Sequence, residues 1–494
     1  MKKPIEETAL YRIVNPRHIA MFGASNRFAA MGTNLLSSIL ALGFEGDIYP
    51  IHPEEEQVMG LDACKSVLDL QITPDLAFIV LPTKVVPEIL EECGKKGIKQ
   101  AIIVSGGFKE VGGNGIVLEK QICDIADKYD MRFVGPNCIG VVNPHHKFNA
   151  TYFPYQQAPG FIGMASQSGS FITQMFDYLA GYGMGYSTGI SVGNEANIDI
   201  VDCLEYLGAC PNTRVISLYI ETIRRGREFI ETARSIVPHK PIVAYYVGGS
   251  EGGKKATFSH TGALSGPDRL YDGIFRQSGV IRANSIEEMF DYCLCLGMCP
   301  KPAGNRVVIQ THSGGPGAVA ADVCTREGLV LNPITDQTFE KLRKYIPHTG
   351  STNNPIDITY SKNSMDYFVD IPKILIEDDA SDAVLIYFLM PDHSVRRAME
   401  SFGITGEKVI EQAGAFIDEQ SKTVADLIKG FSKPFIGFSF YTRENRFIKN
   451  LQDNSIAVLP SPVRAAKALA AMVRYTDYCK KILMAEKAVC VDND

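Results

Sequence analysis

Short apolar runs rich in β-branched residues alternate along the chain with longer segments whose apolar positions recur at helical spacing. This alternation is typical of α/β folds with parallel sheets. The strand-like runs of the first part are His18–Phe22, Asp47–Ile51, Leu76–Leu81, Ala101–Val104 and Arg132–Val134. Helical spacing separates them, as at Thr33–Leu42 and Val85–Lys96. The pattern predicts a doubly wound parallel sheet over residues 1–150.

The same alternation restarts twice. A second block has strand-like runs at Phe161–Ala165, Gly185–Ser191, Val215–Ile220 and Ile242–Val247. A third begins after the breaker at 299–304 and has runs at Val307–Thr311, Ala383–Phe388 and Pro434–Phe438. Both blocks open with a strand, a glycine-rich loop and a helix, which indicates two versions of one flavodoxin-like unit. The predicted domains are therefore residues 1–150, 151–300 and 301–478, followed by a tail at 479–494.

Bulk properties narrow the class of protein. A chain of 494 residues is too long for one hydrophobic core. The net charge of −7, without a basic cluster, argues against nucleic acid and anionic membranes as partners. No apolar signal segment opens the chain, and no run approaches the length of a membrane span. The twelve cysteines form no CxxC pair, and neither they nor the nine histidines have metal-ligand spacing. We expect a cytoplasmic protein with free thiols and no metal site.

Four glycine-containing loops follow predicted strands: Gly23–Ser25, Ser166–Ser170, Thr311–Gly317 and Lys255–Gly266. Strand ends and helix N-termini at this edge of an α/β sheet are where anionic ligands bind. The first loop is not GxGxxG, so a nicotinamide cofactor is less favoured than another nucleotide-like ligand. An ordinary tight turn for the first loop, and simple N-capping by Ser168 for the second, are the alternatives. We favour one anion site shared by the last three loops.

His260 lies in the last of these loops, between glycine-rich flanks. A neutral imidazole nitrogen can take up a phosphoryl group and pass it on. Glu221 ends the strand Val215–Ile220 of the same block, at the edge where ligands bind. A carboxylate there would fix the imidazole tautomer and stabilise a phosphoimidazole. The alternatives are a loop histidine that caps the next helix and a solvated glutamate at a strand end.

Nine motifs in order carry a family resemblance. They are Gly23-Ala24-Ser25, Gly106-Gly107-Phe108, Gly135-Pro136-Asn137-Cys138-Ile139-Gly140, Ser166-Gln167-Ser168-Gly169, Ser191-Val192-Gly193-Asn194, Leu218-Tyr219-Ile220-Glu221, Ser259-His260-Thr261-Gly262, Gly314-Gly315-Pro316-Gly317 and Asn354-Pro355-Ile356-Asp357. Over nearly its whole length the chain resembles the α subunit of nucleoside-diphosphate-forming acyl-CoA synthetases, which include ADP-forming acetyl-CoA synthetase and are related to succinyl-CoA synthetase.

The resemblance implies a CoA-binding Rossmann-like domain followed by two flavodoxin-like, succinyl-CoA synthetase-like domains. It implies that His260 is the phosphorylated nucleophile and that Glu221 orients it. The phosphate-binding residues would be Ser168, Gly169, Gly314, Gly315 and Gly317. The CoA-binding residues would be Gly23, Ala24, Ser25, Pro53, Pro82, Asn137 and Cys138, with Cys138 near the thiol end of CoA.

The reaction implied is reversible: acyl-CoA, phosphate and ADP give the acid, CoA and ATP through an acyl phosphate and phospho-His260. We find no ATP-grasp domain in the sequence, so ADP or ATP with Mg²⁺ is expected on a separate ATP-grasp β-type subunit. An α₂β₂ assembly or a homodimer of this chain is expected.

Four positions depart from the family pattern. Tyr246 stands where Lys is usual, Gly249 where Arg is frequent, His312 where Asn is usual, and Glu54, after Pro53, where Lys is common. Two other functions therefore stay open. One is a nucleotide-independent acyl or carbamoyl transferase on the same scaffold, and the other is a CoA or acyl-CoA sensing module.

Overall fold

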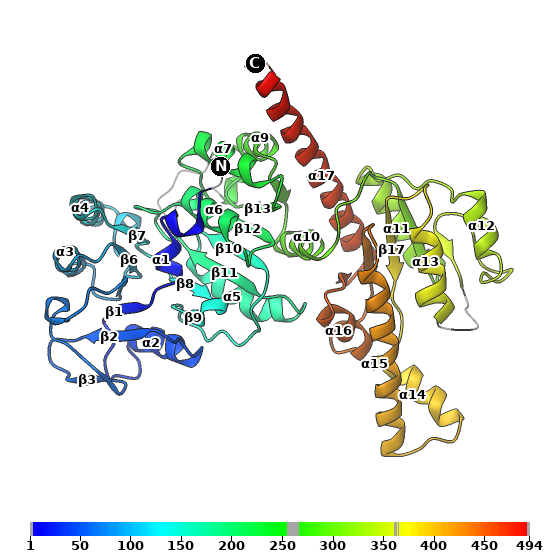
Figure 1. Cartoon of the computed structure of the whole chain (residues 1–494), viewed down its shortest axis with the longest axis horizontal. Helices are drawn as coiled ribbons and strands as arrows, with labels where there is room; N and C mark the ends of the chain where they lie inside the picture. Colours follow the sequence, from blue (N-terminus) through cyan, green and yellow to red (C-terminus); the bar gives the residue numbers. More distant parts are fainter. Residues whose placement is uncertain (1–2, 254–265, 360–362, 364, 492–494) are drawn as a thin grey trace. The chain divides into compact units, whose positions relative to one another are not determined.

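The structure of the chain, a computed structural model, describes residues 3–253, 266–359, 363 and 365–491 (Figure 1). The segment that carries His260 lies outside these ranges. The chain divides into two compact units, which are described separately. Unit 1 comprises Met1–Ala180 and Met184–Asn284, and unit 2 comprises Gly181–Gly183 and Ser285–Asp494.

Unit 1 begins with a five-stranded parallel sheet in the order β2-β1-β5-β6-β7. Its strands are β1 (His18–Phe22), β2 (Asp47–Ile51), β5 (Leu76–Ile79), β6 (Gln100–Ile103) and β7 (Arg132–Val134). Its helices are α1 (Tyr11–Val14), α2 (Met31–Ala41), α3 (Val86–Lys96) and α4 (Asn114–Tyr129), with a small hairpin of β3 (Gln57–Val58) and β4 (Leu61–Asp62). Pro50 lies in the edge strand β2, where the missing N–H costs no ladder bond. Helices α3 and α4 pack side by side (Figure 1).

A second, seven-stranded sheet completes unit 1, in the order β14-β13-β12-β10-β11-β8-β9. The first five of these strands are parallel, and β8 joins β11 in antiparallel direction. The strands are β8 (Val141–Asn143), β9 (Phe148–Asn149), β10 (Ile162–Ser166), β11 (Tyr186–Ser191), β12 (Val215–Ile220), β13 (Ile242–Tyr246) and β14 (Ile281–Ala283). The helices are α5 (Gly169–Ala180), α6 (Ile200–Ala209), α7 (Gly226–Ile236) and α9 (Asp268–Ser278). Strand β10 is buried along its whole length between β11 and β12.

Unit 2 contains a third parallel sheet, in the order β16-β15-β17-β18-β19. Its strands are β15 (Val307–Thr311), β16 (Ile356–Asp357), β17 (Ala383–Tyr387), β18 (Phe435–Phe438) and β19 (Val458–Leu459). The helices are α10 (Ile286–Met298), α11 (Gly314–Arg326), α12 (Asp336–Leu342), α13 (Ile371–Ile376), α14 (Asp392–Ser401), α15 (Glu407–Lys429), α16 (Arg446–Asp453) and α17 (Pro462–Val491). Helix α14 lies along α15 (Figure 1), and α17 is one helix that continues through residue 479.

The α/β class with parallel sheets is confirmed, and each of the twelve predicted strand runs overlaps an observed strand whose ends lie within two residues of the predicted ends. The short edge strands β14, β16 and β19 were not predicted, because two or three residues carry too little pattern. The exact domain boundaries stay a prediction.

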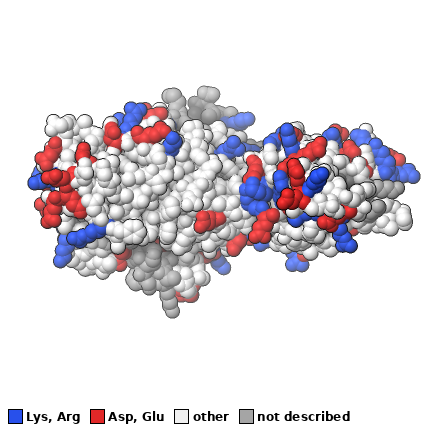
Figure 2. All heavy atoms as spheres, turned by 90° about the horizontal axis from the view of Figure 1, so that it is seen from below, with Lys and Arg blue, Asp and Glu red and all other residues white. Residues whose placement is uncertain are grey.

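Three further observations concern the surface, the helices and the metal-ligating side chains. On the face drawn in Figure 2, basic and acidic side chains are interspersed, and a broad area carries neither. No helix in the described part of the chain is long and apolar enough to cross a membrane. Among the same residues, no cluster of three or more His, Cys, Asp or Glu side chains could hold a metal ion.

Candidate functional site

The Gly23–Ser25 loop leaves the buried end of β1 in a conformation that only glycine tolerates. Gly23 has φ +89°, and a Cβ there would lie 2.0 Å from the Val80 carbonyl oxygen. Ala24 and Ser25 are buried, and the Thr33 hydroxyl of α2 accepts from the Ser25 N–H and donates to its carbonyl. The loop is therefore held close to β5 and to the first turn of α2.

Other predicted CoA-binding residues lie at the ends of neighbouring strands. Pro53 follows β2 and Pro82 follows β5, and both are exposed. Since β2, β1 and β5 are adjacent parallel strands, both prolines lie at the same sheet edge as Gly23. Glu54, where the family pattern favours Lys, is exposed and donates its N–H to the ring of His52.

Asn137 is tied to the strand ends of the first sheet. Its N–H donates to the Ser105 carbonyl at 2.9 Å, and the Ser105 hydroxyl in turn contacts the main chain of Leu81 after β5. Asn137 has φ +57°, a left-handed conformation that Asn adopts more readily than most residues. This chain of hydrogen bonds fixes the loop after β7 against the loops after β5 and β6.

Cys138 is buried beneath this loop. Its thiol lies 3.4 Å from the Ile103 carbonyl oxygen, and burial raises the pKa of the thiol to about 12. The side chain is therefore a neutral thiol at physiological pH rather than an exposed nucleophile.

The loops of the two sheets in unit 1 are joined at this point. The Asn194 N–H donates to the Pro136 carbonyl at 2.9 Å, and the Ile139 N–H donates to the Ser191 hydroxyl at 3.1 Å. A Cβ on Gly169, the first residue of α5, would lie 2.9 Å from the Ile139 side chain. The N-terminus of α5, with Ser168 and Gly169, therefore packs directly against the Asn137–Gly140 segment.

Gln167 connects the start of α5 to Glu221. Its side-chain oxygen accepts from the main-chain N–H groups of Glu221 and Thr222, and its amide nitrogen donates to the Thr222 carbonyl at 2.8 Å. Glu221, directly after β12, is only 5% exposed. The predicted orienting carboxylate is thus a buried residue whose backbone is held by the loop that begins α5.

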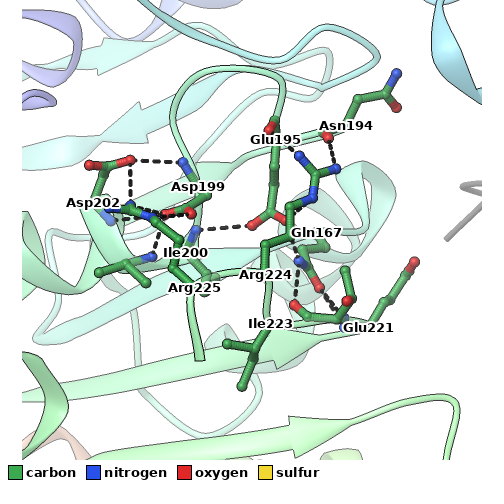
Figure 3. A network of polar contacts seen from close by, with 12 residues as sticks. Gln167, Asn194, Glu195, Asp199, Ile200, Asp202, Glu221, Ile223, Arg224 and Arg225 are labelled. Carbon is green, nitrogen blue, oxygen red and sulfur yellow. Dashed lines mark hydrogen bonds and ion pairs between the residues drawn. The ribbon is translucent and has the colours of Figure 1, made fainter. Parts of the chain in front are cut away.

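Glu195 is a second buried carboxyl beside Gln167 (Figure 3). It accepts from the Gln167 amide at 2.7 Å and from the Ile200 N–H at 2.9 Å. The Arg224 guanidinium is directed mainly at the carbonyl oxygens of Asn194 and Glu195, and its Nε lies 4.0 Å from the Glu195 carboxylate. Burial raises the pKa of Glu195 to about 7, although Arg224 opposes the shift.

A small cavity of about 20 Å³ opens between these groups, roughly the space for one water molecule. Its walls include Lys109, Gln167, Asn194, Glu195, Glu221 and Arg224. Two cations and two carboxylates therefore face a space bounded by residues of both sheets of unit 1.

Gly314, Gly315 and Gly317 begin α11 in unit 2. Gly317 packs on Thr311, whereas a side chain at Gly315 would meet open space. His312, directly after β15, stacks on Tyr367 with ring centroids 3.4 Å apart. Burial lowers the pKa of His312 to about 4, and within the part of the chain that the structure describes its buried Nε2 has no hydrogen-bond partner.

Two further departures from the family pattern have local explanations. The Tyr246 hydroxyl donates to the Gly266 carbonyl at 2.9 Å, and the ring stacks on Tyr271. A Cβ at Gly249 would lie 2.0 Å from the carboxylate of Asp268. Because that carboxylate pairs with Arg282, the space for a larger residue at 249 is taken.

Of the predicted site residues, the structure brings Asn137, Cys138, Ser168, Gly169 and Glu221 together in unit 1. His260 lies outside the described residues. Gln167, Glu195 and Arg224 were missed as functional candidates. One signal could have found them, since each follows one of the adjacent strands β10, β11 and β12, whose ends meet at one edge.

Three family models match the chain. They are a CoA binding domain over residues 17–144, a succinyl-CoA ligase like flavodoxin domain over 159–296 and a Ligase-CoA domain over 307–421. The CoA-binding and flavodoxin-like expectations are thereby confirmed at the level of the family.

Similar proteins span most of the chain. The α subunit of acetate–CoA ligase [ADP-forming] II of Pyrococcus furiosus is 39% identical, covering 76% of this chain and 82% of that subunit. The α subunit of enzyme I of the same organism is 34% identical over 96% and 99%. Acetate–CoA ligase [ADP-forming] I of Archaeoglobus fulgidus is 34% identical, but the chain spans only 64% of its length.

Solved structures agree. Acetyl-coenzyme A synthetase 1 of Ca. Korarchaeum cryptofilum in its apo form has a TM-score of 0.85 and 31% identity, covering 96% of this chain and 99% of that one. The same protein in complex with phosphate and ADP has a TM-score of 0.84, covering 96% and 98%. Shared sequence, shared domain order and shared fold over nearly the whole length lead to one conclusion: the chain belongs to the family of ADP-forming acetate–CoA ligase α subunits.

Proposed function

We propose that this chain is the α-type subunit of an ADP-forming acyl-CoA ligase, which interconverts acyl-CoA, phosphate and ADP with a carboxylic acid, CoA and ATP. The observation that carries the proposal is the meeting of three parts in unit 1. The Asn137–Gly140 segment of the CoA-type domain packs on the N-terminus of α5, and Gln167 joins that N-terminus to the buried Glu221. The reaction requires that a segment near the thioester of the bound acyl-CoA, an anion-binding helix N-terminus and a carboxylate lie close together. These three parts of unit 1 would meet that requirement.

The chemistry runs in three balanced steps. Phosphate attacks the thioester carbonyl, the carbon–sulfur bond breaks, and CoA leaves as a thiol while acyl phosphate forms. A neutral ring nitrogen of His260 then attacks phosphorus, and the acid leaves as a carboxylate. Finally ADP takes the phosphoryl group from His260 to give ATP. The N-terminus of α5 would stabilise the negative charge on the phosphoryl oxygens.

Glu221 would accept a hydrogen bond from the other ring nitrogen of His260. A carboxylate in that position selects the tautomer whose free nitrogen attacks, and it stabilises the positive charge of the phosphorylated ring. We also propose Gly314, Gly315 and Gly317, at the N-terminus of α11, as phosphate-binding residues of unit 2.

The nucleotide step would take place on a separate ATP-grasp β-type subunit that holds ADP or ATP with Mg²⁺. The names of the two Pyrococcus furiosus relatives as α subunits support a partner of this kind. We further propose an α₂β₂ assembly in the cytoplasm, with the domain boundaries predicted from the sequence.

The test is incorporation of labelled phosphate into the purified chain in the presence of a panel of acyl-CoAs. We expect acid-labile, base-stable label with at least one acyl-CoA, which would also name the substrate class. His260→Ala is expected to abolish the label and to keep CoA binding. His239→Ala is the matched control, because His239 is exposed and precedes β13 at the opposite edge of the sheet.

Other outcomes would contradict the proposal. Label that persists in His260→Ala would exclude His260 as the nucleophile. Absence of label with every acyl-CoA and with acetyl phosphate, also after a β-type subunit is added, would favour the transferase or the sensing module. Acyl transfer without phosphohistidine would distinguish the first of these, and CoA binding without any turnover the second.

A further inference from the structure

Glu195 is a buried carboxyl to which the proposed reaction gives no role. It lies between β11 and α6, is 4% exposed, and has a left-handed backbone with φ +53°. Holding a non-glycine residue in this conformation and burying a carboxyl group both cost free energy. Because Glu195 is present despite both costs, we searched its contacts for a role beyond packing.

The carboxyl group receives N–H donors from two sides. Oε2 accepts from the Gln167 amide at 2.7 Å, and Oε1 accepts from the Ile200 N–H at 2.9 Å (Figure 3). Arg224 holds the backbone of this turn through the carbonyl oxygens of Asn194 and Glu195. The position therefore requires two acceptor oxygens, which a carboxylate provides and an amide does not.

Gln167 transmits the position of Glu195 to Glu221. Its amide has two N–H donors and an oxygen with two lone pairs. All four are used: the donors go to Glu195 and the Thr222 carbonyl, and the oxygen accepts from the N–H groups of Glu221 and Thr222. Any change in the Glu195 contact must therefore shift or weaken the contacts to the Glu221 backbone.

We propose that Glu195 is a positioning residue of this site, which acts through Gln167 to hold Glu221 in place for phosphoryl transfer. The inference rests on the proposed function, because it assigns Glu195 to the same site. Glu195 itself contacts neither substrate nor the reacting atoms in this scheme.

The ionisation of Glu195 adds a pH dependence to this role. Several charged or titratable groups surround it: Asp199, Asp202 and Cys203 at the start of α6, Glu221, Arg224 and Arg225 after β12, and Lys109 across the cavity. Burial raises the pKa of Glu195 to about 7. Above pH 7 the ionised group accepts a charge-assisted bond from Gln167, and below pH 7 protonation weakens it. We expect the labelling rate to fall as the pH is lowered through 7.

The decisive variant is Glu195→Gln, which has nearly the same shape but offers one acceptor oxygen to two N–H donors. We expect the labelling rate to fall about 10- to 100-fold, the effect of losing one charge-assisted hydrogen bond, and the limb near pH 7 to disappear. KM for the acyl-CoA should change less than about threefold, because substrate contacts stay intact. Hydrogen exchange of the peptide that contains the Glu221 and Thr222 N–H groups should become faster.

The double variant Gln167→Glu with Glu195→Gln exchanges the two residue types, and it tests the same contact if the single variant loses stability. It restores an amide–carboxylate contact in the reverse direction and keeps acceptors for Glu221 and Thr222, but leaves the Thr222 carbonyl without its donor. We expect the labelling rate of this double variant to be about tenfold higher than that of Glu195→Gln. Asp382→Asn is the control, because Asp382 is a buried carboxylate of unit 2 that accepts from a backbone N–H and an arginine. It should leave the exchange at Glu221 unchanged.

The outcomes separate this inference from the proposed function. If the wild type takes up label and Glu195→Gln does so at the same rate, with the same pH profile and the same hydrogen exchange, the positioning role is wrong and the proposed function stands. If the wild type takes up no label under any condition, the proposed function fails and the role of Glu195 in phosphoryl transfer fails with it.

Discussion

At the scale of single residues, the backbone constraint at Gly23 allows its proposed role in CoA binding to be tested. In Gly23→Ala the new methyl group would meet the Val80 carbonyl oxygen at 2.0 Å, so the loop after β1 has to move. We expect a loss of stability of about 2–3 kcal/mol and a clear loss of CoA affinity, measured by thermal unfolding and calorimetric titration.

The matched control is Gly43→Ala. Gly43 also has a left-handed backbone, with φ +80°, but a Cβ there meets nothing within 4 Å. It isolates the conformational cost of about 1 kcal/mol and should leave CoA binding intact. Equal effects of the two variants on CoA binding would contradict a specific role for the Gly23 loop.

His312 makes a second prediction at this scale. Its pKa is lowered to about 4 by burial, so the folded chain keeps the ring neutral where the unfolded chain binds a proton. The contribution of His312 to the free energy of unfolding is therefore fully present above about pH 6.5. As the pH falls from 6.5 to 4, the free energy of unfolding decreases by about 2 kcal/mol, after allowing for the partial exposure of the ring. His312→Phe can still stack on Tyr367 and does not titrate, so its thermal unfolding should lose less stability between pH 7 and pH 5. An identical pH dependence in both proteins would refute this account.

At the scale of elements, α10 and α17 of unit 2 are joined by a buried ion pair. Arg464 of α17 donates two hydrogen bonds of 2.6 Å to Asp291 of α10, which is 3% exposed. Arg464→Met would leave the carboxylate buried without its cation, and we expect a loss of about 3–5 kcal/mol in urea unfolding.

The double variant Arg464→Met with Asp291→Leu should recover most of this loss, because it removes the buried charge as well. If the double variant is no more stable than the single one, the pair stabilises unit 2 through its packing rather than through its charge.

Elements also differ in how far the sequence predicts them. Long buried strands such as β10 and β12 carry continuous apolar runs, and these runs were read correctly. Strands β8 and β9 were not predicted, because strands of three and two residues depend on their pairing partners, which are β11 for β8 and β8 for β9. Pairing partners, rather than local propensity, decide such elements.

At the scale of the whole molecule, strand order assembles the site of unit 1. Strand β10 pairs with β11 on one side and with β12 on the other, although the three are dispersed over residues 162–220. Because all three are parallel, the loops that follow them meet at one edge, and Gln167, Glu195 and Glu221 come within hydrogen-bonding reach. The antiparallel β8 brings the Asn137–Gly140 segment to the same edge.

The sequence by itself determined the α/β class, the strand–loop–helix units and the glycines that loops of this kind require, because periodicity and backbone sterics are local properties. It also indicated Glu221, since the end of a strand can be read from its apolar run. Only the tertiary structure decided that Gln167 bridges Glu195 and Glu221, that Cys138 is a buried neutral thiol, and that Arg224 holds a turn by its carbonyls. The burial of a side chain and its hydrogen-bond partners depend on residues far apart in the chain, so a local sequence pattern cannot predict either of them.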